Sequence, residues 1–149
     1  KTFAPYDDVT REEFVAIIVR ALKLASDSTD SGFTDVADGR WSAGAITAAK
    51  KAGIISGIND KLFAPTDKIT RQDMALIVMR AGEILGIEFK DGALVYADKD
   101  DIAQYAKDAV ASLSESKIIN GANGRFEPMG YANRAQTAAV VYRLLQAMN

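Results

Sequence analysis

The sequence predicts an all-α, mainly helical fold built from tandem repeats. Helix-start signals occur three times along its 149 residues. Behind each signal, apolar residues recur at i, i+3, i+4 and i+7, which is the spacing that places them on one face of a helix. Loops with glycine and a Phe-x-Pro turn separate these segments. Repetition of one helix–loop–helix unit therefore organises the chain.

The back half of the repeat occurs three times. Its turn reads Phe3-Ala-Pro5, Phe63-Ala-Pro65 and Phe126-Glu-Pro128, and its helix start reads Thr10-Arg-Glu-Glu13, Thr70-Arg-Gln-Asp73 and Asn133-Arg-Ala-Gln136. A Thr or Asn at the cap with an acid or amide three residues later forms a capping box. We expect the three helices that follow to bury their apolar faces against one another as a central three-helix bundle.

The front half of the repeat occurs twice. Phe33-Thr-Asp35, Trp41 and Gly53-Ile-Ile-Ser-Gly57 are echoed by Tyr96-Ala-Asp98, Tyr105 and Lys117-Ile-Ile-Asn-Gly121. The pattern predicts front helices roughly over 40–52 and 103–116, the first ended by a left-handed Gly53. We assign 1–26 to the back half of repeat 1, 27–90 to repeat 2 and 91–149 to repeat 3. Together they would form one compact module with the front helices as peripheral arms.

Composition excludes several classes of function. The net charge is −2 without a long run of one sign, so a general nucleic-acid or anionic-membrane surface is not expected. The longest apolar stretch, 14–19, is too short to span a bilayer, and residues 1–5 lack the apolar core of a signal peptide. Cysteine and histidine are absent, which excludes disulfides and the usual zinc sites. No nucleophile–base motif or phosphate loop occurs, so we expect no enzyme activity, cofactor or metal.

An arginine follows each helix cap, at Arg11, Arg71 and Arg134. A cation is mildly unfavourable at the positive end of the helix dipole, so something must offset its presence. One explanation is a bound carboxylate or phosphate, held by the guanidinium together with free backbone N–H groups. The other is an ion pair with a neighbouring acid such as Asp35, Asp38 or Asp98. The sequence leaves both open.

Other repeated positions also admit two interpretations. Trp41 and Tyr105 occupy one repeat position, where a flat aromatic ring would suit a sugar or would pack the arm against the bundle. Gly57 and Gly121 would allow a ligand to approach the backbone, or would permit a left-handed turn. Arginines late in each back helix suit the negative end of the dipole and are interpreted as structural; they are Arg20, Arg80 and Arg143. The acids Asp98, Asp100 and Asp101 resemble part of a calcium loop, but helix capping explains them better because the glycine and distal glutamate are missing.

These elements, in this order, resemble the S-layer homology repeat. The resemblance rests on Phe33-Thr-Asp-Val, Trp41, Gly53-Ile-Ile-Ser-Gly57, Phe63-Ala-Pro65 and Thr70-Arg71, and covers nearly the whole chain. It implies a pseudo-three-fold spindle with grooves between adjacent arms. It also implies attachment to secondary cell-wall polysaccharides, often ones with pyruvate ketals on N-acetylmannosamine, outside the cell at a bacterial cell wall or S-layer.

The family's T-R-A-E-like motif, whose arginine contributes to polymer binding, maps to 10–13, 70–73 and 133–136. The resemblance therefore implies one groove around Arg11 with the arm of Trp41, and one around Arg71 with the arm of Tyr105. The arginine is kept in all three motifs, while the last replaces Thr by Asn133 and the acid by Gln136.

The leading hypothesis is a non-catalytic anchor that binds a pyruvylated wall polysaccharide, either as a monomer or as part of a larger surface protein. Its predicted site comprises the three arginines together with Trp41, Tyr105, Asp35, Asp98, Gly57 and Gly121. One alternative is a protein–protein assembly module of an S-layer or surface complex. A second is a small glycan hydrolase that depends on two carboxylates.

Overall fold

The computed structural model describes residues 4–148 and confirms the all-α prediction. Over these residues the chain forms α-helices and two short 3-10 helices, with isolated β-bridges in place of strands. Phe3 of the first Phe-Ala-Pro turn and the opening residues considered for a signal peptide lie outside the described residues. The elements are α1 (Arg11–Ala21), α2 (Ala43–Lys51), α3 (Arg71–Ile84), η1 (Lys99–Asp101), η2 (Gln104–Ala106), α4 (Lys107–Glu115) and α5 (Arg134–Gln146).

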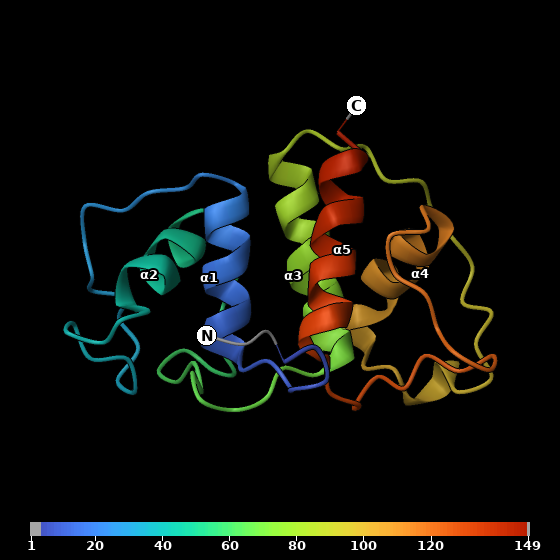
Figure 1. The fold of residues 1–149 in the computed structure, drawn as a ribbon, viewed down its shortest axis with the longest axis horizontal. Helices are drawn as coiled ribbons and strands as arrows, with labels where there is room; N and C mark the ends of the chain where they lie inside the picture. The colour runs from blue at the N-terminus through green and yellow to red at the C-terminus, as the bar shows by residue number, and fades with distance from the viewer. Residues whose placement is uncertain (1–3, 149) are drawn as a thin grey trace. The chain divides into compact units, whose positions relative to one another are not determined.

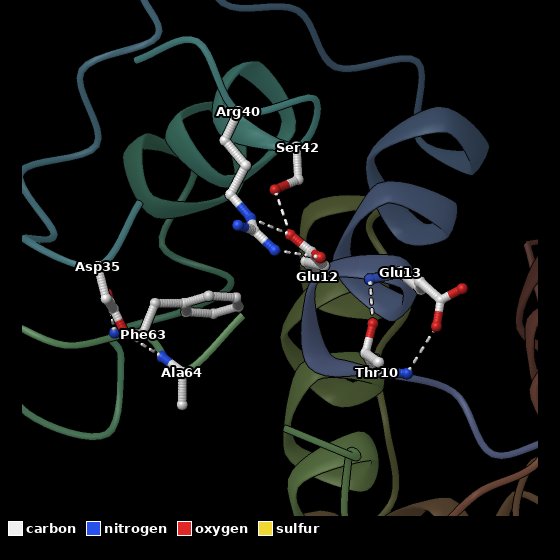
Figure 2. Close-up of polar contacts among 8 residues, drawn as sticks. All are labelled: Thr10, Glu12, Glu13, Asp35, Arg40, Ser42, Phe63 and Ala64. Atoms are coloured by element: carbon white, nitrogen blue, oxygen red, sulfur yellow. Dashed lines mark hydrogen bonds and ion pairs between the residues drawn. The ribbon is translucent and has the colours of Figure 1, made fainter. Parts of the chain in front are cut away.

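The back helices α1, α3 and α5 begin where their capping signals predict. The Thr10 hydroxyl accepts the N–H of Glu13 at 3.3 Å, while Glu13 Oε1 accepts the N–H of Thr10 at 2.9 Å (Figure 2). Asn133 and Gln136 form the same reciprocal pair at 2.8 and 3.0 Å. These bonds satisfy two backbone donors that the start of a helix leaves without intrahelical partners.

The front helices start later than predicted. α2 begins at Ala43 and α4 at Lys107, because the segments before them bond to a back helix instead of continuing the helical ladder. Ser42 does not cap α2 but donates its hydroxyl to Glu12, and the N–H of Ala103 donates to Gln72. The helix therefore loses its first turn in both arms.

The ends of the front helices follow the predicted left-handed cap. Gly53 has φ +80°, and the next N–H, that of Ile54, reaches back to the carbonyl of Ala49. The second arm uses Lys117 at φ +59° for the same turn, with the N–H of Ile118 on the carbonyl of Leu113. One repeat thus keeps the cap geometry without the glycine that favours it.

The chain divides into two compact units, described separately here. One comprises Val9–Lys68, and the other combines Ile69–Asn149 with the residues up to Asp8. In the first, α2 packs against α1; in the second, α4 packs against α3, and α3 lies beside α5 (Figure 1). Each arm therefore packs on the back helix of the preceding repeat. The three-helix bundle, its pseudo-three-fold symmetry and the repeat boundaries stay predictions.

Each unit has its own apolar core. In α3 the predicted stripe of Met74, Ile77, Val78 and Ala81 is buried throughout. In α1 the buried face comprises Phe14, Val15, Ile18 and Val19, whereas Ile17, also expected inside, is 37% exposed. The loop rings are buried as well, since Phe63 and Phe126 are 0% and 1% exposed.

Candidate functional site

The first-turn amides of the back helices all have protein partners, which corrects the expectation of free N–H groups waiting for an anion. The N–H groups of Arg11 and Glu12 donate to the carbonyls of Asp67 and Pro65 at 2.8 and 3.1 Å. The same pair of bonds recurs at the start of α3, where Arg71 and Gln72 donate to Gly130 and Pro128, and at the start of α5, where Arg134 and Ala135 donate to Asp7 and Pro5. The Phe-x-Pro loop of another copy thus caps each back helix, so any ligand must be bound by side chains.

An aspartate holds each of the two complete loops in shape. Both carboxylate oxygens of Asp35 accept backbone N–H groups, from Phe63 at 2.9 Å and Ala64 at 2.8 Å (Figure 2). Asp98 does the same for Phe126 and Glu127, at 2.8 Å each. These predicted site residues therefore shape the loop that carries the buried phenyl ring.

Asp98 is only 5% exposed, and its carboxyl is perturbed accordingly. Burial acts to raise the pKa of Asp98, but the backbone N–H bonds from Phe126 and Glu127 outweigh burial and lower that pKa below its ordinary value. The guanidinium of Arg125, 3.9 Å away, acts in the same direction. Asp98 consequently stays ionised at neutral pH and keeps both bonds.

Arg11 and Arg71 lie on the phenyl rings of these loops in matching geometry. Arg11 Nε donates to the carbonyl of Phe63 at 2.9 Å, and its Cζ lies 4.9 Å from the centroid of that ring. Arg71 Nε donates to the carbonyl of Phe126 at 2.8 Å, and its Cζ also lies 4.9 Å from the ring centroid. A cation over an aromatic face at this distance is attracted by the ring. Neither guanidinium can swing freely.

Arg71 has capacity for a further partner. Its Nη2 donates to the carbonyl of Asn120 at 2.9 Å, so two of the five N–H donors of the guanidinium are used by residues 4–148. Burial lowers the pKa of Arg71, although an arginine remains charged at any physiological pH. A fixed, partly desolvated cation with spare donors is suited to a carboxylate or phosphate.

Two adjoining clefts open at Arg71. The first, about 250 Å³, runs along the Phe126 loop past Gly121, Arg125 and Tyr131. The second, about 320 Å³, lies between α3, α5 and the end of the arm. Its wall carries a second cation, Arg143, but no carboxylate; the full lining is Arg71, Met74, Ile119, Asn120, Ala135, Gln136, Ala139, Val140 and Arg143. The second cleft therefore combines positive charge with an apolar floor.

The aromatic positions of the two arms differ in their surroundings. Tyr105 is 56% exposed, donates its hydroxyl to Asp73 Oδ1 at 2.6 Å and accepts from Gln72 Nε2 at 3.3 Å. It thus lies at the first turn of α3, close in sequence to Arg71. Trp41 is 65% exposed and lines a cleft between α1 and α2 whose arginine is Arg20.

A bidentate ion pair ties the first arm to α1. Arg40 Nε and Nη2 donate to the two carboxylate oxygens of Glu12 at 2.7 and 2.8 Å, and the Ser42 hydroxyl donates to the same carboxylate at 2.7 Å (Figure 2). The bond from Arg40 is the largest cause of a pKa of Glu12 below its ordinary value, against the opposing effect of burial. The same pair raises the pKa of Arg40.

The two loop glycines are required by packing. Gly57 has φ +82°, and a Cβ there would lie 2.6 Å from the Phe33 ring and 2.7 Å from the carbonyl oxygen of Leu62. A Cβ at Gly121 would collide with the carbonyl of Arg125 and the ring of Tyr96. Of the two, Gly121 also lines the cleft at Arg71.

The predicted site residues gather in two places. Arg71, Asp98 and Gly121 lie around the Phe126 loop, and Arg11, Asp35 and Gly57 lie around the Phe63 loop. Arg134, partly exposed, begins α5. Sequence reasoning missed Asn120 and Gln136 as lining residues and assigned Arg143 only a structural role. The recurrence of an arginine late in each helix was the available signal for Arg143.

Other kinds of site find no support among residues 4–148. No cluster of three acidic, histidine or cysteine side chains there is arranged to hold a metal ion. No helix in the same part of the chain has the length and apolar character needed to cross a membrane.

The helical repeats and the side-chain clefts between them define a tandem-repeat binding module. The S-layer homology domain model matches residues 32–75 and 95–138, more than half of the chain. The chain belongs to the S-layer homology domain family. Such domains are non-catalytic, bind cell-wall polymers and anchor the proteins that carry them, which places this chain at the bacterial cell wall or surface.

Much larger proteins contain similar segments. The amylopullulanase of Thermoanaerobacterium thermosulfurigenes is 42% identical over 97% of this chain, which corresponds to 8% of the relative. The exoglucanase XynX of Acetivibrio thermocellus is 42% identical over 99% of this chain and 14% of the relative. The cellulosome-anchoring protein of Acetivibrio thermocellus is 28% identical over 97% of this chain and 33% of its own length. The chain thus spans a small part of each relative.

Proposed function

We propose that the chain anchors a larger surface protein by binding an anionic cell-wall polysaccharide, of the pyruvylated N-acetylmannosamine type, in the cleft of Arg71 and Arg143. The observation that carries the proposal is the fixed guanidinium of Arg71. It is held by two backbone carbonyls, lies on a buried ring and still has N–H donors for a ligand. A donor that is already oriented loses less conformational entropy when a ligand binds.

The chemistry of the cleft fits a sugar-linked carboxylate. Arg71 and Arg143 supply positive charge, and no acidic side chain opposes it in the lining. The amide groups of Asn120 and Gln136 offer hydrogen bonds to hydroxyl or acetamido groups. A pyruvate ketal carries one carboxylate and one methyl group, and the apolar floor of the cleft suits the methyl group.

The relatives support an anchoring role. Two are named as polysaccharide-degrading enzymes and one as a cellulosome-anchoring protein, and the similarity to this chain occupies a minor part of each. An appended module that holds such proteins at the wall explains why it recurs in proteins with different names.

Co-sedimentation with purified cell walls tests the proposal. Arg71→Ala should weaken binding about ten- to a hundred-fold, because a hydrogen-bonded ion pair contributes roughly 1.5–3 kcal/mol. Arg71→Lys should recover little, since lysine lacks the planar fork. Lys51→Ala removes the same charge from the end of α2 and serves as the matched control. Thermal unfolding should show that each variant is folded.

Walls from which pyruvate has been removed by mild acid separate this proposal from the alternative. Binding to them should fall as far as the Arg71→Ala variant falls on intact walls. If the parent chain binds both wall preparations equally, the anionic saccharide is the wrong ligand, and a protein partner becomes the better explanation. If Arg71→Ala binds intact walls as the parent does, the site is wrongly placed.

A further inference from the structure

The cleft between α1 and α2 is separate from the arginine site just described. It has a volume of about 260 Å³ and lies wholly within the Val9–Lys68 unit. Its lining is Ala16, Val19, Arg20, Leu24, Ser26, Trp41, Gly44, Ala45 and Ala48. Trp41, the one tryptophan of the chain, lines this cleft and is 65% exposed.

We propose that this cleft is a second saccharide subsite, which takes a neutral pyranose ring with equatorial substituents against the indole of Trp41. The proposal rests on the proposed function, because the ring would belong to the same kind of wall glycan. It goes beyond that function by adding a contact that requires no charge on the sugar.

The exposed indole is the first observation. A tryptophan that exposes about two thirds of its surface leaves a large apolar area in water, and indoles commonly stay exposed where a partner covers them. A pyranose with equatorial substituents presents one face of C–H groups, which is apolar and flat enough to lie on an aromatic ring. The indole N–H remains at the edge of the ring as a polar group.

Gly44 is the second observation. Glycine weakens a helix by up to roughly 1 kcal/mol relative to alanine, and a Cβ at this position would meet no atom within 4 Å. Packing therefore does not require glycine here. The matching residue of the second arm is Asp108, an acid in the first turn where the helix dipole favours it. α2 has neither the acid nor the alanine, and the space remains open as part of the cleft.

The polar groups of the cleft favour a neutral ligand. Arg20 is exposed and makes no ion pair with residues 4–148, so its N–H donors are available to hydroxyl or acetamido oxygens. Arg20 is the single cation of the lining, whereas the cleft at Arg71 contains two. Arg11, expected beside Trp41 from the family resemblance, does not line this cleft. It lies nine residues earlier on α1, about 13 Å along the helix axis at 1.5 Å per residue.

Trp41 makes the test direct, because the tryptophan fluorescence of the intact chain reports this cleft alone. The probe is the trisaccharide of β-1,4-linked N-acetylglucosamine, which is neutral and has equatorial substituents. Saturable binding should shift the emission to shorter wavelength as the sugar displaces water from the indole. Arg20→Ala and Gly44→Asp should each weaken the apparent affinity about ten-fold, since each removes a contact or fills the space.

Arg71→Ala is the matched control and should leave the fluorescence titration unchanged. The proposal is wrong if the trisaccharide causes no saturable change, or if Arg20→Ala and Gly44→Asp titrate as the parent does. The wall-binding assay with Arg71→Ala is independent of this readout. Failure of the subsite would therefore leave the arginine site standing, and failure of the arginine site would leave a positive Trp41 titration to be explained by a neutral glycan.

Discussion

Replacing Asp98 by asparagine should destabilise the chain by about 2–4 kcal/mol. Asp98 is 5% exposed and accepts two backbone N–H groups at 2.8 Å each. A hydrogen bond to a charged group contributes roughly 1.5–3 kcal/mol. The asparagine oxygen can retain one bond, but its NH2 group would face the second N–H. That donor would then be buried without an acceptor, which costs about 1–3 kcal/mol.

Thermal unfolding followed by circular dichroism at pH 7 measures this loss. For a chain of this size, 1 kcal/mol shifts the midpoint by about 2–4 °C, so Asp98→Asn should lower the Tm by roughly 6–12 °C. Asp100→Asn is the matched control, because Asp100 is exposed in the same short helix η1. Should the two variants melt together, the two backbone bonds do not hold the Phe126 loop as the structure indicates.

Two further predictions concern the unit that contains α1. Stability to urea should fall as the pH drops below about 4, because Glu12 and Asp98 have pKa values below their ordinary 4.5 and 3.8 in the folded chain. Ionised carboxylates stabilise the fold above those ordinary values, and the contribution is lost as the pH falls through the lowered ones. Glu12→Gln should flatten the titration, and an unchanged slope would contradict the role of the Arg40 pair. Gly57→Ala should cost more than about 2 kcal/mol, since it combines φ +82° with the steric overlap at Phe33, while Gly39→Ala, with no atom near its Cβ, should be nearly neutral. Equal unfolding midpoints for these two glycine variants would argue against the loop geometry.

Local features of the fold were predictable because their physical causes lie within a few residues. The capping residues Thr10 and Asn133 bond to residues three positions away, so the sequence alone places the starts of α1 and α5. The left-handed cap at Gly53 is likewise local. The front helices were predicted too long because Ser42 bonds to Glu12, thirty residues away, and nothing near Ser42 in the sequence indicates that bond.

The site was predictable only in part for the same reason. The repeat identified Arg71 and Gly121, which line the cleft, but gave no indication that Arg143 of a different helix lies on the same wall. Trp41 was correctly singled out as an unusual position, yet the arginine of its cleft is Arg20, whereas the family resemblance paired it with Arg11.

The sequence by itself determined the helical repeats, their caps and the family, because periodicity and capping act between neighbouring residues. Only the tertiary structure decided what surrounds each arginine. The partners of Arg11 and Arg71 lie 52 and 55 residues away, and the first-turn amides that looked available to an anion are bonded to carbonyls of another repeat's loop. Partners so distant in the sequence leave no periodic pattern, since folding alone brings them within hydrogen-bonding distance.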